Sequence, residues 1–176
     1  MSVNLSFHGR VWLIKDKEGK LIDDIDTDQI YHNAHLAITD IKEMGKFAFG
    51  NLEGMKDFAK DVKPGDTVIV GGNFGAGSSR QQAVDCFKSL GIACIVARSF
   101  GAIYKRNAIN SGYPILTIEN IDLHKLSNLD VVTVDADAQT IVRSDGTKVG
   151  NLKPLAGVQR DILEAGDLFE YAKRMK

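Results

Sequence analysis

The middle of the chain alternates between strand-like and helix-like spacing of its hydrophobic residues. Apolar runs at 67–70, 92–97 and 113–118 are short and continuous, which predicts buried strands. Between them, hydrophobic residues recur every three or four positions at 79–90 and 100–111, which predicts two helices. Strands that alternate with helices favour parallel pairing through right-handed crossovers. We therefore expect an α/β fold with a partly parallel sheet flanked by helices.

The flanking segments follow other patterns. Residues 7–15 alternate roughly between apolar and polar positions, which predicts a first strand. Residues 129–150 indicate strand, turn and strand, with Asp145-Gly146 as a hairpin signal. The hydrophobic positions in 159–175 predict one closing amphipathic helix. A chain of 176 residues has room for one domain, so we expect a single domain, 1–176, with a β-rich margin.

Composition and charge narrow the class of protein. The chain is 44% hydrophobic and 26% charged, which is typical of soluble globular proteins. Its net charge of −1 offers no global field for nucleic acid or an anionic membrane. No apolar run approaches the length of a membrane span, and the first residues lack the apolar core of a secretion signal. We expect a cytoplasmic protein with no nucleic-acid or membrane partner.

Potential metal ligands are sparse. The two cysteines, Cys86 and Cys94, fall in a helical and a strand-like pattern, which favours buried thiols over a disulfide or a metal pair. The four histidines show no helical metal-binding spacing. We do not expect a metal or cofactor site built by this chain alone.

The most unusual stretch is VIVGGNFGAGSSRQQA, in which a strand enters a loop with four glycines and leaves it through two serines and Arg80. A glycine-rich loop before a helix gathers unpaired N–H groups and the positive end of the helix dipole, an arrangement that binds anions. Ser78 or Ser79 stands where a helix N-cap belongs. The plain alternative is a serine cap behind a glycine turn, with Arg80 in solvent.

Neither of the two common nucleotide-binding loops matches this stretch. Gly72 and Gly77 have the spacing of a P-loop, but Ser78 replaces its essential lysine. Gly75 and Gly77 begin a dinucleotide fingerprint, but Arg80 replaces its third glycine. What remains is a loop that presents a serine hydroxyl and a guanidinium together. Since arginine binds carboxylates bidentately, a carboxylate ligand is the better hypothesis.

Several separated motifs resemble those of one family. GGNFGAGSSRQQA, GIACIVARSF, IYKRNAIN and GYPIL follow one another as in the small subunits of the 3-isopropylmalate dehydratase group of the aconitase superfamily, and DDIDTDQI resembles a further signature of that group. The resemblance spans about residues 9–116. It implies a swivelling domain with a β/β/α layered core, and a separate large subunit that carries a 4Fe-4S cluster on its own cysteines. The implied reaction is dehydration of a 2-hydroxy acid, usually followed by rehydration at the neighbouring carbon.

The resemblance also implies roles for the loop residues. Ser78 would be the base that removes a proton from carbon, and Arg80 would hold a substrate carboxylate. Ser79 and the loop amides, including that of Gly77, would assist in binding. Such a serine is expected to be an ordinary alcohol until a partner closes over it.

Further residues are expected to support this loop. Asp28 is the candidate for a supporting carboxylate that orients Arg80 or a partner group. The alternative for the aspartates of 23–28 is a polar turn with capping roles. The second predicted helix is expected to brace the loop through Arg106, Asn107 and Asn110. The alternative is that these polar residues form a solvated face.

Substrate choice is expected to depend on the segment after DTDQI. In the resembling family this segment contacts the variable side group of the substrate, and here it contains His35, Leu36, Ala37 and Ile38. Apolar residues favour an alkyl-bearing substrate such as 3-isopropylmalate or a methylated malate, because an extra carboxylate would stay unpaired against them. The alternative is that Leu36 and Ile38 only pack. Departures from the family pattern at Gln81-Gln82 and Ala102 leave the particular hydroxy acid open.

Three functions are consistent with the sequence. The first is the substrate-closing subunit of an iron–sulfur hydro-lyase, working with the large subunit on a small hydroxy acid. The second is a non-catalytic anion-binding module that kept the loop. The third is a regulatory RNA-binding protein, which the balanced charge argues against.

Overall fold

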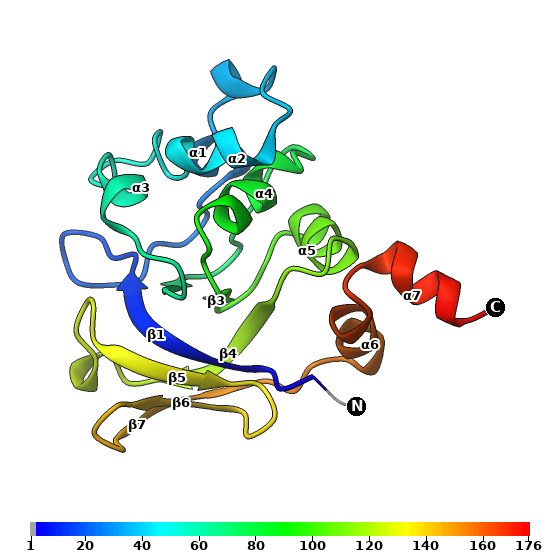
Figure 1. Ribbon diagram of the computed structural model, residues 1–176. Helices are drawn as coiled ribbons and strands as arrows, with labels where there is room; N and C mark the ends of the chain where they lie inside the picture. The colour runs from blue at the N-terminus through cyan, green and yellow to red at the C-terminus, as the bar shows by residue number, and fades with distance from the viewer. Residues whose placement is uncertain (1–2) are drawn as a thin grey trace.

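The computed structural model describes residues 3–176, and its centre is a closed barrel of seven strands (Figure 1). The strands are neighbours in the order β1-β2-β3-β4-β7-β6-β5. Their bounds are β1 Ser6–Leu13, β2 Thr67–Val70, β3 Cys94–Ala97, β4 Ile115–Ile121, β5 Val131–Asp135, β6 Thr140–Arg143 and β7 Lys148–Leu152.

The parallel pairing predicted from the strand–helix alternation is confirmed. Strands β1 to β4 pair in parallel, with Val68 opposite Ile95 and Val96 opposite Leu116. The remaining strands pair antiparallel and return to β1 through β5. The expectation of a layered sheet was incomplete, because the antiparallel margin closes the sheet into a barrel instead of forming a separate layer.

The helices lie mainly outside the parallel strands. Helix α5 falls within the predicted segment 100–111. The prediction of one closing helix is wrong, because the segment forms two helices, α6 and α7. They are separated at Gly166, whose φ of 110° suits glycine. The helical bounds are α1 Thr27–Ile30, α2 Ile41–Met44, α3 Phe58–Asp61, α4 Gln82–Ser89, α5 Ala102–Asn110, α6 Gly157–Ala165 and α7 Leu168–Arg174, with 3-10 turns η1 Asn33–His35, η2 Gly45–Phe47 and η3 Leu123–Lys125.

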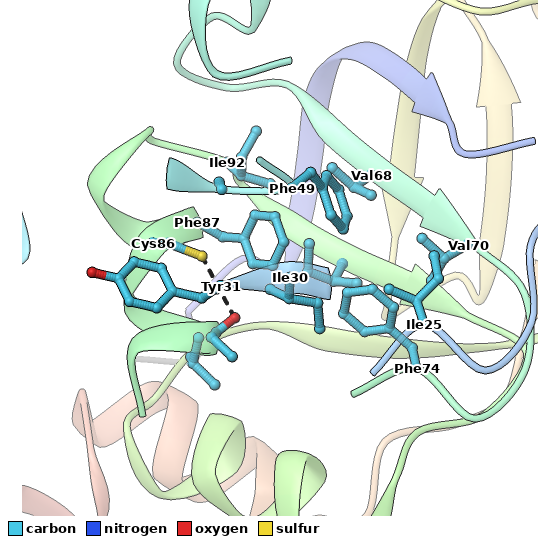
Figure 2. Packing of buried hydrophobic residues seen from close by; sticks show 14 of the residues in the cluster. Ile25, Ile30, Tyr31, Phe49, Val68, Val70, Phe74, Cys86, Phe87 and Ile92 are labelled. Carbon is cyan, nitrogen blue, oxygen red and sulfur yellow. Dashed lines mark hydrogen bonds between the residues drawn. The ribbon is translucent and has the colours of Figure 1, made fainter. Parts of the chain in front are cut away.

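The residues that the structure describes form two hydrophobic clusters, one on each face of the parallel strands. Successive residues of a strand point to opposite faces, so Ile69 joins the barrel interior while Val68 and Val70 face the helices. The outer cluster continues into the glycine loop through Phe74, which packs against Phe87 of α4 (Figure 2). Packing of this outer cluster therefore fixes the base of the loop.

Both cysteines are buried, as predicted. Cys94 lies inside the barrel, and Cys86 of α4 lies in the outer cluster, where its thiol donates to the carbonyl of Ala83 (Figure 2). Burial raises the pKa of the Cys94 thiol to about 12 and that of Cys86 further still, so both stay protonated. Of the helices formed by residues 3–176, none combines the length and apolar character that a membrane crossing needs.

Asp66 joins β1 to the start of β2. Its carboxylate accepts from the Arg10 guanidinium at 2.7 Å and from the Trp12 ring nitrogen at 2.8 Å, and it also accepts from the Lys63 amide. Burial by itself would raise the pKa of this carboxyl, but these hydrogen bonds hold the pKa below its usual value. Asp66 is therefore ionised and fully bonded in the folded chain.

Asp66→Asn is expected to lower the free energy of unfolding at pH 7 by about 2–4 kcal/mol, because it leaves Arg10 without its buried partner. The folded pKa is depressed, so the ion pair stabilises the fold above the unfolded pKa of about 4, and this stabilisation is lost as pH falls through the folded value. Urea unfolding at pH 7 and about pH 3 measures both effects. Asp161→Asn, at an exposed site, should change stability by less than about 0.5 kcal/mol; equal losses in the two variants would contradict this role.

Candidate active site

The glycine loop follows β2 and is held by backbone hydrogen bonds, chiefly to the segment that follows β3. The Phe74 amide donates to the Ser99 carbonyl, the Gly101 amide donates to the Phe74 carbonyl, and the Gly75 amide donates to Ile25. Gly75 has φ of 81°, and a Cβ there would lie 2.2 Å from the Tyr104 ring. The loop needs glycine at this position both for its backbone conformation and for close packing on α5.

The expected serine N-cap is wrong. Helix α4 begins at Gln82, its N-cap is Gln81, and no side chain caps it. The helical periodicity begins at Ser79 and did not reveal the later helix start. Gln81 already has helical dihedrals, whereas Ser78 and Ser79 stay in the loop. The backbone N–H groups of residues 77–82 have no acceptor within the described chain. The loop and the first helical turn together therefore present a continuous set of free donors, which suits an anion.

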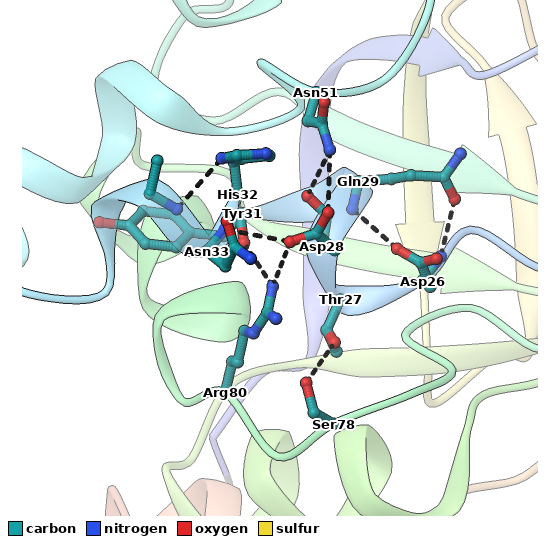
Figure 3. Close-up of polar contacts among 11 residues, drawn as sticks. Asp26, Thr27, Asp28, Gln29, Tyr31, His32, Asn33, Asn51, Ser78 and Arg80 are labelled. Atoms are coloured by element: carbon teal, nitrogen blue, oxygen red, sulfur yellow. Dashed lines mark hydrogen bonds and ion pairs between the residues drawn. The ribbon is translucent and has the colours of Figure 1, made fainter.

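Ser78 and Arg80 both point from the loop toward α1 (Figure 3). The Ser78 hydroxyl lies 3.4 Å from that of Thr27, at the long limit of a hydrogen bond. Nη1 of Arg80 donates to Asp28 at 2.8 Å and to the Tyr31 carbonyl at 3.2 Å. The tertiary fold thus brings together all three residues that the sequence indicated as catalytic: Ser78, Arg80 and Asp28.

Asp28 connects four segments. Besides Arg80, it accepts from the Asn33 amide at 3.0 Å and from the Asn51 side chain at 3.1 Å (Figure 3). The hydrogen bond from Arg80 lowers the pKa of Asp28 most, and the Asn33 amide lowers it further, so the carboxylate is charged at neutral pH. The contact between Asp28 and Arg80 agrees with the orienting role considered for Asp28. Asn51 was missed, because nothing in the sequence brings its segment to α1.

The capping alternative for the aspartate run is also realised, at a different residue. Asp26 is the N-cap of α1 and forms a reciprocal capping box with Gln29 (Figure 3). The spacing Asp-x-x-Gln was a readable signal for this helix start. Asp26 therefore builds the short helix, and that helix presents Asp28 to the glycine loop.

Of the three residues of α5 that were expected to brace the glycine loop, one is bonded to it. The Asn107 side-chain amide donates to the Ser79 hydroxyl at 3.2 Å. Within the described chain, Arg106 and Asn110 make no side-chain hydrogen bond to the loop, and Arg106 is exposed. Ser79 is therefore anchored to α5, whereas the Ser78 hydroxyl keeps only its long contact to Thr27.

The segment 35–38 divides into packed and exposed side chains. The His35 ring stacks on Phe47 with 3.7 Å between centroids, and Ile38 packs against the outer hydrophobic cluster. Leu36 and Ala37 are exposed, and the Leu36 carbonyl accepts from Gln82 at the start of α4. The packing alternative therefore holds for Ile38, and Leu36 and Ala37 are the side chains that remain open to a ligand.

The donor set of this chain does not fit an iron–sulfur cluster. Such clusters are held by several cysteine thiolates, whereas this chain has two cysteines, both buried and protonated. No group of three potential metal-ligating side chains occurs in residues 3–176. We therefore derive no catalytic step from a metal held by this chain.

Comparison with known proteins agrees with the fold and the site. Residues 22–121 match the aconitase C-terminal domain family. A 3-isopropylmalate dehydratase small subunit of Lachnospira eligens is 37% identical over 98% of both chains, and a methanogen homoaconitase small subunit of Methanocaldococcus jannaschii is 39% identical over 93% of this chain and 94% of its own. The crystal structure of 3-isopropylmalate dehydratase from M. jannaschii superposes with a TM-score of 0.82 at 34% identity, over 97% of this chain and 95% of that one.

The barrel, the glycine loop and these matches define an aconitase-type domain of the kind found in small subunits. Within that class, the chain belongs to the family of 3-isopropylmalate dehydratase small subunits, which are components of hydro-lyases.

Proposed function

We propose that this chain is the small subunit of an iron–sulfur hydro-lyase that dehydrates and isomerises an alkyl-substituted 2-hydroxy acid, with 3-isopropylmalate as the leading candidate. One observation carries the proposal: the Ser78 hydroxyl and the Arg80 guanidinium lie on one loop, point the same way and border a run of free amides. The partner is a large subunit whose cluster supplies Lewis-acid activation of the hydroxyl that leaves as water.

Arg80 binds a substrate carboxylate in this proposal. Asp28 and the Tyr31 carbonyl engage only Nη1, and Nε and Nη2 have no acceptor within the described chain. That free edge has the geometry for a bidentate carboxylate pair. Asp28 stays charged and holds the guanidinium in place, so that little side-chain freedom is lost when the substrate binds.

Ser78 removes the proton from carbon in this proposal, and the electron pair of that C–H bond forms the double bond as the hydroxyl leaves. An alkoxide needs strong stabilisation, and a helix N-terminus contributes at most about 2 kcal/mol. Ser78 precedes α4 by several residues, so the free amides of 77–82 and Arg80 must supply most of it. These dipoles act strongly only when water is excluded from the site. Because the loop is exposed in this chain, a partner must cover it to exclude water.

The purified chain alone is therefore expected to show no dehydratase activity, and co-expression with a cluster-binding large subunit should restore it. The complex, kept anaerobic, is assayed against 3-isopropylmalate, dimethylmalate, citrate and homocitrate. Because Leu36 and Ala37 offer no cation to an extra carboxylate, kcat/KM should favour the alkyl substrates over homocitrate by about tenfold or more. Turnover by the isolated chain, or a preference for homocitrate, would refute these parts of the proposal.

Arg80→Lys is expected to raise KM of the complex by about 10–100-fold, because a point charge loses one of the two charge-assisted hydrogen bonds. Steady-state kinetics at a fixed ratio of subunits measures it. Arg106→Lys is the matched control, since Arg106 is exposed on neighbouring α5 and its side chain makes no hydrogen bond to the loop within the described residues. An unchanged KM in Arg80→Lys would show that the carboxylate binds elsewhere.

A further inference from the structure

A cavity of about 500 Å³ is lined by the segment that follows β3 and by β4, and neither Ser78 nor Arg80 is among its lining residues. Its lining includes Lys105 and Ile109 of α5 and residues 153–156 of the linker from β7 into α6. We call it the α5–α6 cavity. Its volume is in the range of small-molecule sites.

Three cations surround this cavity: Arg98 after β3, Lys105 on α5 and Lys153 after β7. No salt bridge or side-chain hydrogen bond of the described chain involves any of them, and no carboxylate is among the described residues that line the cavity. Three exposed positive charges around one concavity, none of them in a salt bridge within the described residues, favour an anion.

A buried side chain gives a second, independent indication of a ligand. Gln159 of α6 lines the cavity and is only 8% exposed, and its amide nitrogen donates to the Ile115 carbonyl at 3.0 Å. Its carbonyl oxygen has no donor within the described chain. No fully buried side-chain oxygen of the described residues lacks a partner, so this oxygen is accessible, and Gln159 lines the cavity, where the oxygen can accept one hydrogen bond.

Apolar side chains complete the lining, including Ile109, Leu155 and Val158. The exposed fraction of Val158 is 59%, which is high for a residue next to a concave surface. These side chains offer an alkyl group a place beside the cations. The lining therefore combines positive charge, one hydrogen-bond acceptor and an apolar wall.

We propose that the α5–α6 cavity binds a small carboxylate that carries a hydroxyl group and a branched alkyl side chain. The cations hold the carboxylate, the Gln159 oxygen accepts from the hydroxyl, and the apolar wall covers the alkyl group. The site is separate from the one under the proposed function and does not depend on it. An occupant also contacts Ser99, which accepts hydrogen bonds from Asn73 and Phe74 of the glycine loop, and Phe100, whose ring packs against that of Phe74.

Titration of the full chain with α-hydroxyisocaproate, followed by amide chemical shifts, tests the proposal. The shifts of Phe100, Ile109, Thr117 and Val158 should move together, with a dissociation constant on the order of 1 mM, as expected for so small a ligand. Isocaproate, which lacks the hydroxyl, should bind several-fold more weakly because the Gln159 oxygen then stays unpaired. Added salt should weaken binding of both probes.

Charge-reversed variants locate the site. Lys105→Glu and Lys153→Glu should each weaken the probe by about fivefold or more, whereas Lys148→Glu, an exposed lysine outside the cavity, should not. Shifts confined to residues 77–82, equal losses in all three variants, or no shifts at about ten times the expected dissociation constant would overturn the proposal.

Discussion

Replacing Ser78 by alanine is expected to reduce kcat of the reconstituted complex by about a thousandfold or more while leaving subunit association intact. The expected size is that of losing a positioned base, about 10²–10⁴-fold. The Ser78 hydroxyl makes only the 3.4 Å contact to Thr27, so its loss should change the free energy of unfolding little. Turnover of 3-isopropylmalate under anaerobic conditions and a pull-down of the large subunit measure the two effects separately.

Ser79→Ala is the matched comparison for this prediction. Ser79 is the adjacent serine of the same loop, but its hydroxyl is bonded to Asn107 of α5. Its removal should lower kcat/KM by about tenfold or less, because it loosens the loop and removes no base. Near-normal turnover in Ser78→Ala, or equal losses in the two variants, would mean that another group takes the proton.

The second large effect is expected at Gly75. In Gly75→Ala, a methyl group would lie 2.2 Å from the Tyr104 ring, which is buried and held by its hydroxyl bond to the Ala83 carbonyl. The left-handed φ of 81° adds about 1–2 kcal/mol of strain, and the overpacking adds about 1–3 kcal/mol. We expect a loss of about 2–5 kcal/mol in the free energy of unfolding, measured by urea denaturation.

Gly54→Ala isolates the steric part of this effect. Gly54 has the same φ of 81°, but a Cβ there has nothing within 4 Å. Its cost should be the backbone strain alone, about 1–2 kcal/mol. If the two variants lose the same stability, the contact between the glycine loop and Tyr104 is not a constraint on the fold, and the loop has room to move.

The two predictions are linked by how the site is built. Phe74 is packed in the outer cluster, Gly75 allows the loop to approach α5, and Ser78 and Arg80 then extend over α1. The proposed catalysis by Ser78 requires this placement, because dipoles stabilise an anion best when they are already oriented toward it. A loop displaced by Gly75→Ala should therefore lose turnover as well as stability.

Local pattern allowed much of this protein to be predicted. Periods of two and 3.6 residues are direct consequences of strand and helix geometry, so the strands around the glycine loop and helix α5 were found. The order of glycines, serines and arginine identified the family and predicted an anion-binding loop, because those residues stand next to one another in the sequence. The start of α4 and the division of the C-terminal helix were wrong, because dihedrals at Gln81 and Gly166 depend on the surrounding turn.

The sequence by itself therefore determined the family and the loop on which Ser78, Ser79 and Arg80 stand. The tertiary structure alone decided what they contact: Arg80 meets Asp28 from 52 positions away, and Asn51 reaches the same carboxylate from another segment. It also decided that the antiparallel strands close a barrel and that Gln159 lines a cavity. Such contacts join segments far apart in the chain, and their geometry depends on how both clusters pack, which no local period of the sequence records.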